Sequence, residues 1–287
     1  TYNTAVGHSA GEFLTTGTQN TLIGGLAGDA QTTSSGNTAL GYASLTTNVL
    51  GSNSVAIGRN ALNAQNPATA TDMYNVAVGN NCGEAITTGT FNTLMGGLAG
   101  DALTTGGTNV AVGYLSLSTE DTGRQSVAVG YQALAVQNKD DTNLNTAVGY
   151  QAGLAITTGV SNDIFGGSAG DALTTGSFNV ALGRSSLSAD TQGSQSVAVG
   201  HAALATQNFT TATDTFNTAV GYAAGNDVTT GTKNTLIGGL TGDALTDGVE
   251  NVALGYNSLG ADTRGSKSVA LGKEALKVQN QTTSVST

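Results

Sequence analysis

This 287-residue chain has no tryptophan, one proline, one cysteine and only 5% aromatic residues. So few bulky side chains exclude the thick core of an ordinary globular domain. Hydrophobic residues still make up 38% of the chain, a content that also argues against a disordered protein. With 42 glycines beside this apolar fraction, the composition is typical of thin layers packed closely on one another.

Charged residues are also scarce. Nineteen acidic against nine basic residues give a net charge of −10, which disfavours binding to nucleic acid or to an anionic membrane surface. No run of eighteen apolar residues is present, so membrane insertion is not expected. The single cysteine, Cys82, cannot form an internal disulfide and leaves the redox compartment open. The chain begins at Thr1 without a methionine or an apolar leader, which we interpret as processing or excision from a longer protein.

What the chain has instead is a repeat in which Asn or Ser, three residues of strand type and a glycine recur sixteen times. The interval from Gly7 to Gly24 is kept within each group of four glycines, and the interval between groups is slightly longer, as from Gly58 to Gly79. The glycines are Gly7, Gly24, Gly41, Gly58, Gly79, Gly96, Gly113, Gly130, Gly149, Gly166, Gly183, Gly200, Gly221, Gly238, Gly255 and Gly272. This spacing predicts one domain over 1–287, built of sixteen coils in four-coil cassettes. The cassettes cover about 1–72, 73–142, 143–214 and 215–287.

A coil of about 17 residues is too short for the crossovers of globular α/β units, so the repeat predicts an all-β fold, a parallel β-solenoid. The invariant glycine indicates a positive φ or a close backbone approach. "LTTG", "ITTG" or "VTTG" predicts a second short strand and its turn, and the insertions after every fourth coil predict loops on one edge. An apolar residue stands directly before the first repeat Asn of each cassette, and we expect these residues to form an apolar lid over the loops: Tyr2, Tyr74, Leu144 and Phe216.

The phrase "NSVAIG" at 53–58 resembles the head repeat of trimeric autotransporter adhesins, the YadA-like β-roll. The longer phrase "NTAVGYQAG…ITTG" at 145–159 is similar to repeats of bacteriophage tail fibres. The resemblance covers essentially the whole chain and is more specific for architecture than for function. It implies a left-handed β-roll of three parallel chains, exposed outside a bacterial cell or on a virion. The coil is longer than that usual in adhesin heads, which favours the phage fibre.

Trimerisation is also predicted from the residues themselves. In "NVAVG" at 109–113, Val110 and Val112 point to one side of the strand and Ala111 to the other, and both sides are apolar. A single thin roll covers only one side, so a lone chain would expose an apolar stripe larger than monomers usually show. Three stripes closed around an axis would be buried, which predicts a parallel homotrimer.

Glycine and aspartate recur in "GGLAGDA" at 24–30 and in its later copies, a pattern similar to the calcium-binding nonapeptide of repeat toxins. The calcium candidates are Asp29, Asp101, Asp171 and Asp243. They lie four coils apart, or about 19 Å at the usual strand spacing. A single carboxylate cannot supply the six to eight oxygens that calcium takes, so a structural turn is the favoured interpretation and no cofactor is expected.

The residue after each repeat glycine is expected to point outward. Six tyrosines in this position are candidates for receptor contact, with plain packing as the alternative: Tyr42, Tyr114, Tyr131, Tyr150, Tyr222 and Tyr256. His8 and His201 share the position but lie in distant cassettes, which disfavours a zinc site or a catalytic triad.

Other reactive side chains have structural explanations. Cys82 replaces alanine at an interior position where every coil has a small residue, so we expect a buried, inert thiol. Two pairs of adjacent acids, Glu120/Asp121 and Asp140/Asp141, could serve a glycosidase but are more simply explained as solvated loop residues. The chain is therefore expected not to be an enzyme.

The function that fits these observations is structural and adhesive. We expect a fibre segment, of a phage tail fibre above all, that displays or forms a surface for a glycan or protein receptor of the host. The alternatives are the head of a bacterial surface adhesin, a polysaccharide-cleaving tailspike and, from the Thr-Thr pairs, an ice-binding solenoid. Neither end carries the polar cap that solenoids need, so we expect flanking domains or end-to-end continuation.

Overall fold

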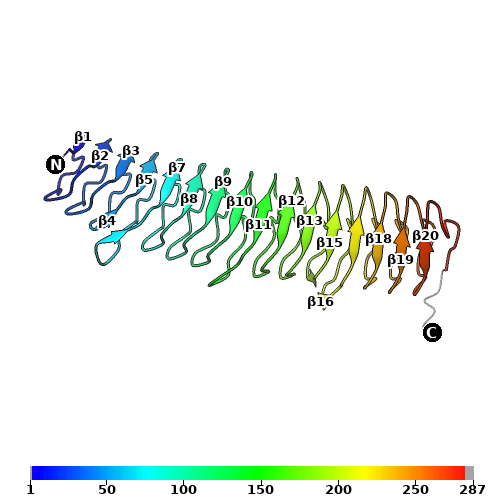
Figure 1. The fold of residues 1–287 in the computed structure, drawn as a ribbon. Coiled ribbons are helices and arrows are strands. Elements are labelled where there is room, and N and C mark those ends of the chain that lie inside the picture. The colour runs from blue at the N-terminus through cyan, green and yellow to red at the C-terminus, as the bar shows by residue number, and fades with distance from the viewer. Residues whose placement is uncertain (1, 282–287) are drawn as a thin grey trace. The chain divides into compact units, whose positions relative to one another are not determined.

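The computed structural model describes residues 2–281 and shows one short strand per coil (Figure 1). Residues 2–281 contain no helix, and the fold is the predicted all-β parallel solenoid of about sixteen coils. The chain divides into two compact units, Thr1–Leu144 and Asn145–Thr287. The single domain and the four cassettes stay predictions from the sequence.

Unit 1 is a parallel ladder of eight three-residue strands with one accessory pair. Its strands are β1 Thr4–Val6, β2 Thr21–Ile23, β3 Thr38–Leu40, β4 Gly51–Ser52, β5 Val55–Ile57, β6 Thr71–Asp72, β7 Val76–Val78, β8 Thr93–Met95, β9 Val110–Val112 and β10 Val127–Val129. Strands one coil apart pair in register, so that Ala111 lies opposite Ala128. The register continues across an insertion, where Ala56 lies opposite Ala77.

Unit 2 repeats the same arrangement. Its strands are β11 Thr146–Val148, β12 Asp163–Phe165, β13 Val180–Leu182, β14 Gly193–Ser194, β15 Val197–Val199, β16 Thr213–Asp214, β17 Thr218–Val220, β18 Thr235–Ile237, β19 Val252–Leu254 and β20 Val269–Leu271. Here Ala198 pairs with Ala219 across the insertion that carries β16. The insertions expected to be loops thus contribute short strands, since β6 pairs with β4 and β16 with β14.

The repeat glycine allows successive coils to approach backbone to backbone. Gly113 has a φ of 135°, and a Cβ placed on it would lie 2.3 Å from the carbonyl oxygen of Gly130 in the next coil. No other residue type fits this combination of conformation and distance. The predicted requirement for positive φ at this position is confirmed.

The repeat asparagine forms a buried ladder between coils. Asn20 accepts the backbone N–H of Asn37 at its Oδ1 (3.0 Å) and donates from Nδ2 to the carbonyl of Ser34 (2.9 Å). Asn37 in turn accepts the N–H of Ser54 (2.9 Å). Each side chain therefore binds its own coil and the next, which satisfies backbone groups that would otherwise be buried without partners.

The second strand predicted at the Thr-Thr-Gly segments is wrong. The N–H groups of Thr15, Thr16 and Gly17 all lie within 2.9–3.3 Å of one acceptor, the carbonyl oxygen of Thr32. A strand would spread these bonds over successive carbonyls. The chain instead curves around a single oxygen, so the segment is a corner.

The interior is narrow, and neighbouring coils fill it by alternating side-chain size. Leu22, at the centre of β2, is fully buried, and a Cβ added to Gly11 or Gly28 would lie within 3 Å of its methyl groups. In the following coil the strand centre is Ala39, and Leu45 takes the place of the glycine. The predicted narrow interior is confirmed, and the alternation of Gly and Leu follows from this exchange of volume.

A buried carboxylate anchors the second and the third insertion, and sequence reasoning missed it. Asp190 accepts hydrogen bonds from Gly193 N–H (3.0 Å), Gln207 Nε2 (2.6 Å) and Phe209 N–H (3.0 Å). Phe209 belongs to the insertion, so the carboxylate ties the loop to the coil beneath it. The equivalent residues are Asn48, Glu120 and Asp262, all buried. The available signal was their constant place in the repeat, at one fixed interval after the glycine in the third coil of each cassette.

Gln31 stands at a position where the equivalent coils have a buried leucine. Gln31 is fully buried with no partner for either amide atom, whereas Leu103, Leu173 and Leu245 occupy its place in later coils. Gln31→Leu should raise the free energy of unfolding by about 1–3 kcal/mol, because an unsatisfied polar group is removed. The measurement is chemical denaturation followed by circular dichroism.

The matched control is Gln65→Leu. Gln65 is also buried, but it binds Ser54 and Asn75 at 3.0–3.3 Å. Its replacement should lower stability because its partners lose their bonds. A destabilising effect of Gln31→Leu would show that the Gln31 amide is satisfied in solution.

Candidate functional surface

The outward face of each sheet is an apolar stripe. The central residue of each strand points into the solenoid, so the two flanking residues point outward. Met95 is 48% exposed, and Leu40 is 44% exposed. In unit 2 the exposed apolar residues of the strands are Phe165, Leu182, Ile237, Val252, Leu254, Val269 and Leu271. The exposed stripe predicted for a lone chain is therefore present in both units.

In some coils a large side chain extends this stripe at the edge where the strand begins. Tyr74 and Phe91 stack with ring centroids 5.6 Å apart, and each has a positive φ. The predicted lid over the insertions is wrong, because Tyr2, Tyr74, Leu144 and Phe216 are each at least half exposed. Their left-handed backbone turns these side chains outward at the corner before the strand.

A second column of aromatic residues follows the repeat glycines. All six predicted tyrosines are exposed, as are His8 and His201. Tyr42 and Tyr114 lie over Gly25 and Gly97 of the preceding coil, since a Cβ on either glycine would be 3.5 Å from the ring. Tyr114 also stacks on Tyr131 (5.9 Å) and His201 on Tyr222 (5.5 Å). The outward placement is confirmed, and the role in receptor contact stays a prediction.

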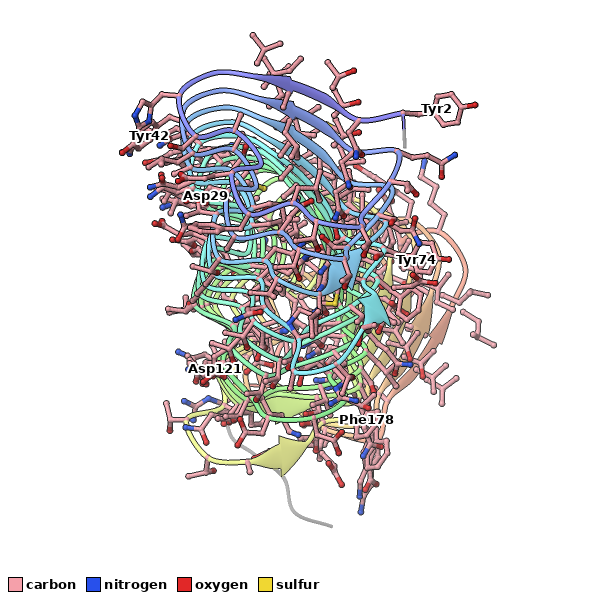
Figure 2. The ribbon with its side chains drawn as sticks, turned by 90° about the vertical axis from the view of Figure 1, so that its left-hand side faces the viewer. Tyr2, Asp29, Tyr42, Tyr74, Asp121 and Phe178 are labelled. Atoms are coloured by element: carbon pink, nitrogen blue, oxygen red, sulfur yellow. The ribbon has the colours of Figure 1, made fainter. Side chains whose placement is uncertain are left out.

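In unit 1 the two columns lie on opposite sides of the solenoid. Figure 2 shows Tyr2 and Tyr74 on one side and Tyr42, together with Asp29, on the other. The apolar strand face lies between the two columns, because the strand separates Tyr74 from the position after the glycine. The strand face of unit 1 thus lies between the column before the strand and the column after the repeat glycine.

The four candidate calcium ligands lie at half-buried corners. Burial raises the pKa of all four: Asp29, Asp101, Asp171 and Asp243. An acid of the preceding coil adds to the rise in three of them: Glu12 beside Asp29, Glu84 beside Asp101 and Asp227 beside Asp243. Among residues 2–281 no group of three or more His, Cys, Asp or Glu side chains is placed to hold a metal ion. At most two carboxylates meet at any of these corners, which is fewer oxygens than calcium takes.

The remaining candidates have structural positions. Glu120 is not a solvated loop acid as predicted; it is buried and accepts hydrogen bonds from Gly123 N–H, Gln137 and Asn143 at 2.8–2.9 Å. Asp140 and Asp141 are exposed. Cys82 is fully buried, and burial raises the pKa of its thiol to about 12, so it is protonated at neutral pH.

The family comparison matches the coils just described. The YadA head domain repeat matches at residues 38–61, 122–138 and 192–213, about a fifth of the chain. In these stretches the chain is similar to the YadA head repeat. The matched stretches include β3, β5, β10 and β15, the strands of third and fourth coils. No curated protein and no solved structure gives a significant match.

YadA head repeats indicate a segment of an adhesive fibre or adhesin that is exposed at a surface. The matched stretch 192–213 also covers Gln207 and Phe209, two partners of the buried Asp190. Within the described residues there is no helix long and apolar enough to cross a membrane. The apolar strand face and the tyrosine column both lie on the outer surface of the described residues.

The raised pKa of Asp101 gives a test of the aspartate corners. Because the folded-state pKa of Asp101 is raised, stability falls as the pH rises from the usual value of 3.8 through the folded-state pKa, and this cost is absent below 3.8. Asp101→Asn should therefore be more stable than the parent at neutral pH, and this difference should vanish below pH 3.8. Denaturation curves across this pH range measure it.

Asp140→Asn, an exposed change of the same charge, is the control. A neutral-pH loss of stability in Asp101→Asn would contradict the burial argument. If calcium stabilised the parent but not Asp101→Asn, the calcium hypothesis would replace the structural turn.

Proposed function

We propose that the chain is a segment of a parallel homotrimeric fibre that displays or forms a receptor-binding surface on a virion or a bacterial cell. The observation that carries the proposal is the apolar face between two outward columns. Eight coils at ~4.8 Å give a stripe about 38 Å long in each unit. With a strand of three residues, each stripe is at most on the order of 400 Å², the size of the largest apolar patch on a typical monomer, which often serves in binding.

A threefold ring suits this surface better than a face-to-face dimer. In a ring each copy uses two different surfaces, one against each neighbour. The strand face and the Tyr2/Tyr74 side of unit 1 are two such surfaces, and a dimer through the strand face alone would leave the Tyr2/Tyr74 side in water. The YadA head repeats support the same assembly.

The finer proposal is a phage tail fibre. It is supported by the phrase "NTAVGYQAG…ITTG" at 145–159 and by the length of the coil. The head of a bacterial adhesin is the alternative, and the matched YadA repeat favours it. The host receptor would be a glycan or a protein, with the tyrosine column as the candidate contact surface.

The proposal includes no catalytic step. A glycan-cleaving spike needs two carboxyl groups facing a substrate, but Glu120 is fully enclosed by hydrogen-bond donors. An ice-binding surface needs a flat array of threonines. The Thr-Thr pairs instead form corners around a single carbonyl, as at Thr15 and Thr16.

Sedimentation equilibrium tests the assembly. The expected mass is about 85 kDa, three times the 28.3 kDa chain. Met95→Lys should lower the trimer fraction, because it places a charge on the apolar face. Asp140→Lys, in an exposed insertion, should leave the mass unchanged. A stable species with the mass of one chain that binds no apolar dye would rule out the trimer.

A further inference from the structure

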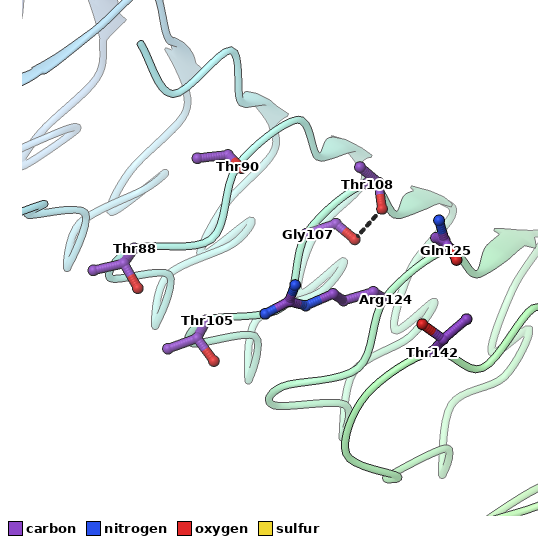
Figure 3. A pocket seen from close by; sticks show the side chains of 8 residues that line it. All are labelled: Thr88, Thr90, Thr105, Gly107, Thr108, Arg124, Gln125 and Thr142. Atoms are coloured by element: carbon purple, nitrogen blue, oxygen red, sulfur yellow. Dashed lines mark hydrogen bonds between the residues drawn. The ribbon is translucent and has the colours of Figure 1, made fainter. Parts of the chain in front are cut away.

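A polar pocket opens at one corner of unit 1. It has a volume of about 400 Å³ and is lined by Thr88, Thr90, Thr105, Gly107, Thr108, Arg124, Gln125 and Thr142 (Figure 3). The lining contains one cation, five threonines and no carboxylate. A volume of this size is in the lower part of the range for small-molecule sites, ~300–1,000 Å³. The pocket thus combines a positive charge with many hydroxyl groups.

The pocket lies where the repeat is broken. In the first cassette Thr18 N–H donates to Ser35 Oγ and Ser35 N–H to Ser52 Oγ, both at 3.0 Å. The third cassette repeats this pair of bonds through Ser177 and Ser194, at 3.1 and 3.0 Å. A column of serine hydroxyls therefore satisfies the backbone N–H groups at this corner.

The second cassette has lost both serines. Gly107 stands where Ser35 and Ser177 stand, and Arg124 stands where Ser52 and Ser194 stand. Among the hydrogen bonds of the described residues, none gives the N–H of Thr90 or of Gly107 an acceptor. Gly107 is buried, and a buried N–H without an acceptor is costly. Two adjacent coils therefore each present a free N–H at the pocket.

The guanidinium of Arg124 supplies charge at the same corner. In Figure 3 its side chain extends across the pocket toward Thr105 and Gly107. Three ion pairs occur among the described residues, and they involve Lys233, Arg264 and Lys277 but not Arg124. In a chain of net charge −10, an arginine without a carboxylate partner is available to an anionic ligand.

We propose that this pocket binds the carboxylate of an acidic sugar residue of the uronic acid type. The guanidinium and the N–H groups of Thr90 and Gly107 would bind the carboxylate oxygens, since both are donors suited to an anion. The hydroxyls of Thr88, Thr105 and Thr108 line the space beside them and would bind sugar hydroxyls. The choice of a sugar rests on the proposed adhesive function, whereas the choice of a carboxylate rests on the pocket alone.

Saturation-transfer NMR with the full chain tests the proposal, with D-glucuronate as the probe. Glucuronate should show transfer and saturable binding, whereas D-glucose, which lacks the carboxylate, should not at the same concentration. Arg124→Ser, which installs the residue of the other cassettes and an acceptor for Gly107, should weaken binding at least about tenfold. Arg184→Ser, the same change of charge at an exposed position in unit 2, should leave binding unchanged.

The outcomes separate this inference from the proposed function. Absence of glucuronate binding, or equal binding by Arg124→Ser, would overturn it, even if the chain sediments as a trimer. Acetate binding as tightly as glucuronate would overturn the assignment to a sugar. Glucuronate binding by a chain that sediments as a monomer would uphold the pocket and contradict the trimeric fibre.

Discussion

Successive coils touch backbone to backbone at one glycine per coil, and the rest of the structure depends on that contact. A Cβ on Gly113 would lie 2.3 Å from the carbonyl oxygen of Gly130, so no side chain can stand between the two coils. Since each coil buries only the central residue of its strand, a lone chain leaves apolar side chains such as Met95 exposed. A row of such exposed apolar side chains favours association with another copy. The repeat that makes the chain a solenoid therefore also suits it to a larger fibre.

Much of the fold could be predicted because the backbone of each coil requires the same residue types at the same positions. Each position of the coil accepts only certain residue types. These types therefore predict where the strands lie, where the glycines have a positive φ and which small residues are buried. The corner at Thr15 could not be predicted, because three N–H groups sharing the carbonyl of Thr32 leave no trace in residue type. The exposure of Tyr74 could not be predicted either, because the sequence shows a large apolar residue but not the positive φ that turns it outward.

The candidate site was harder to predict than the fold because it lies in departures from the repeat. The tyrosine column is regular and was found. In the sequence Glu120 looks like a loop acid because it adjoins Asp121, whereas its equivalence to Asp190 identifies it as an anchor. Gly107 and Arg124 are ordinary residues taken singly. Only the structure shows that they remove two hydroxyl acceptors from one corner.

The most direct test of the account is whether the outward strand face is covered in solution. Met95→Cys places a thiol on that face, and Asp140→Cys places one in an exposed insertion, while the native Cys82 is buried in both. Labelling of the native protein with a thiol reagent should modify position 140 rapidly and position 95 only after denaturation. Equally fast labelling at both positions would show that the face lies in water and would contradict the trimeric fibre.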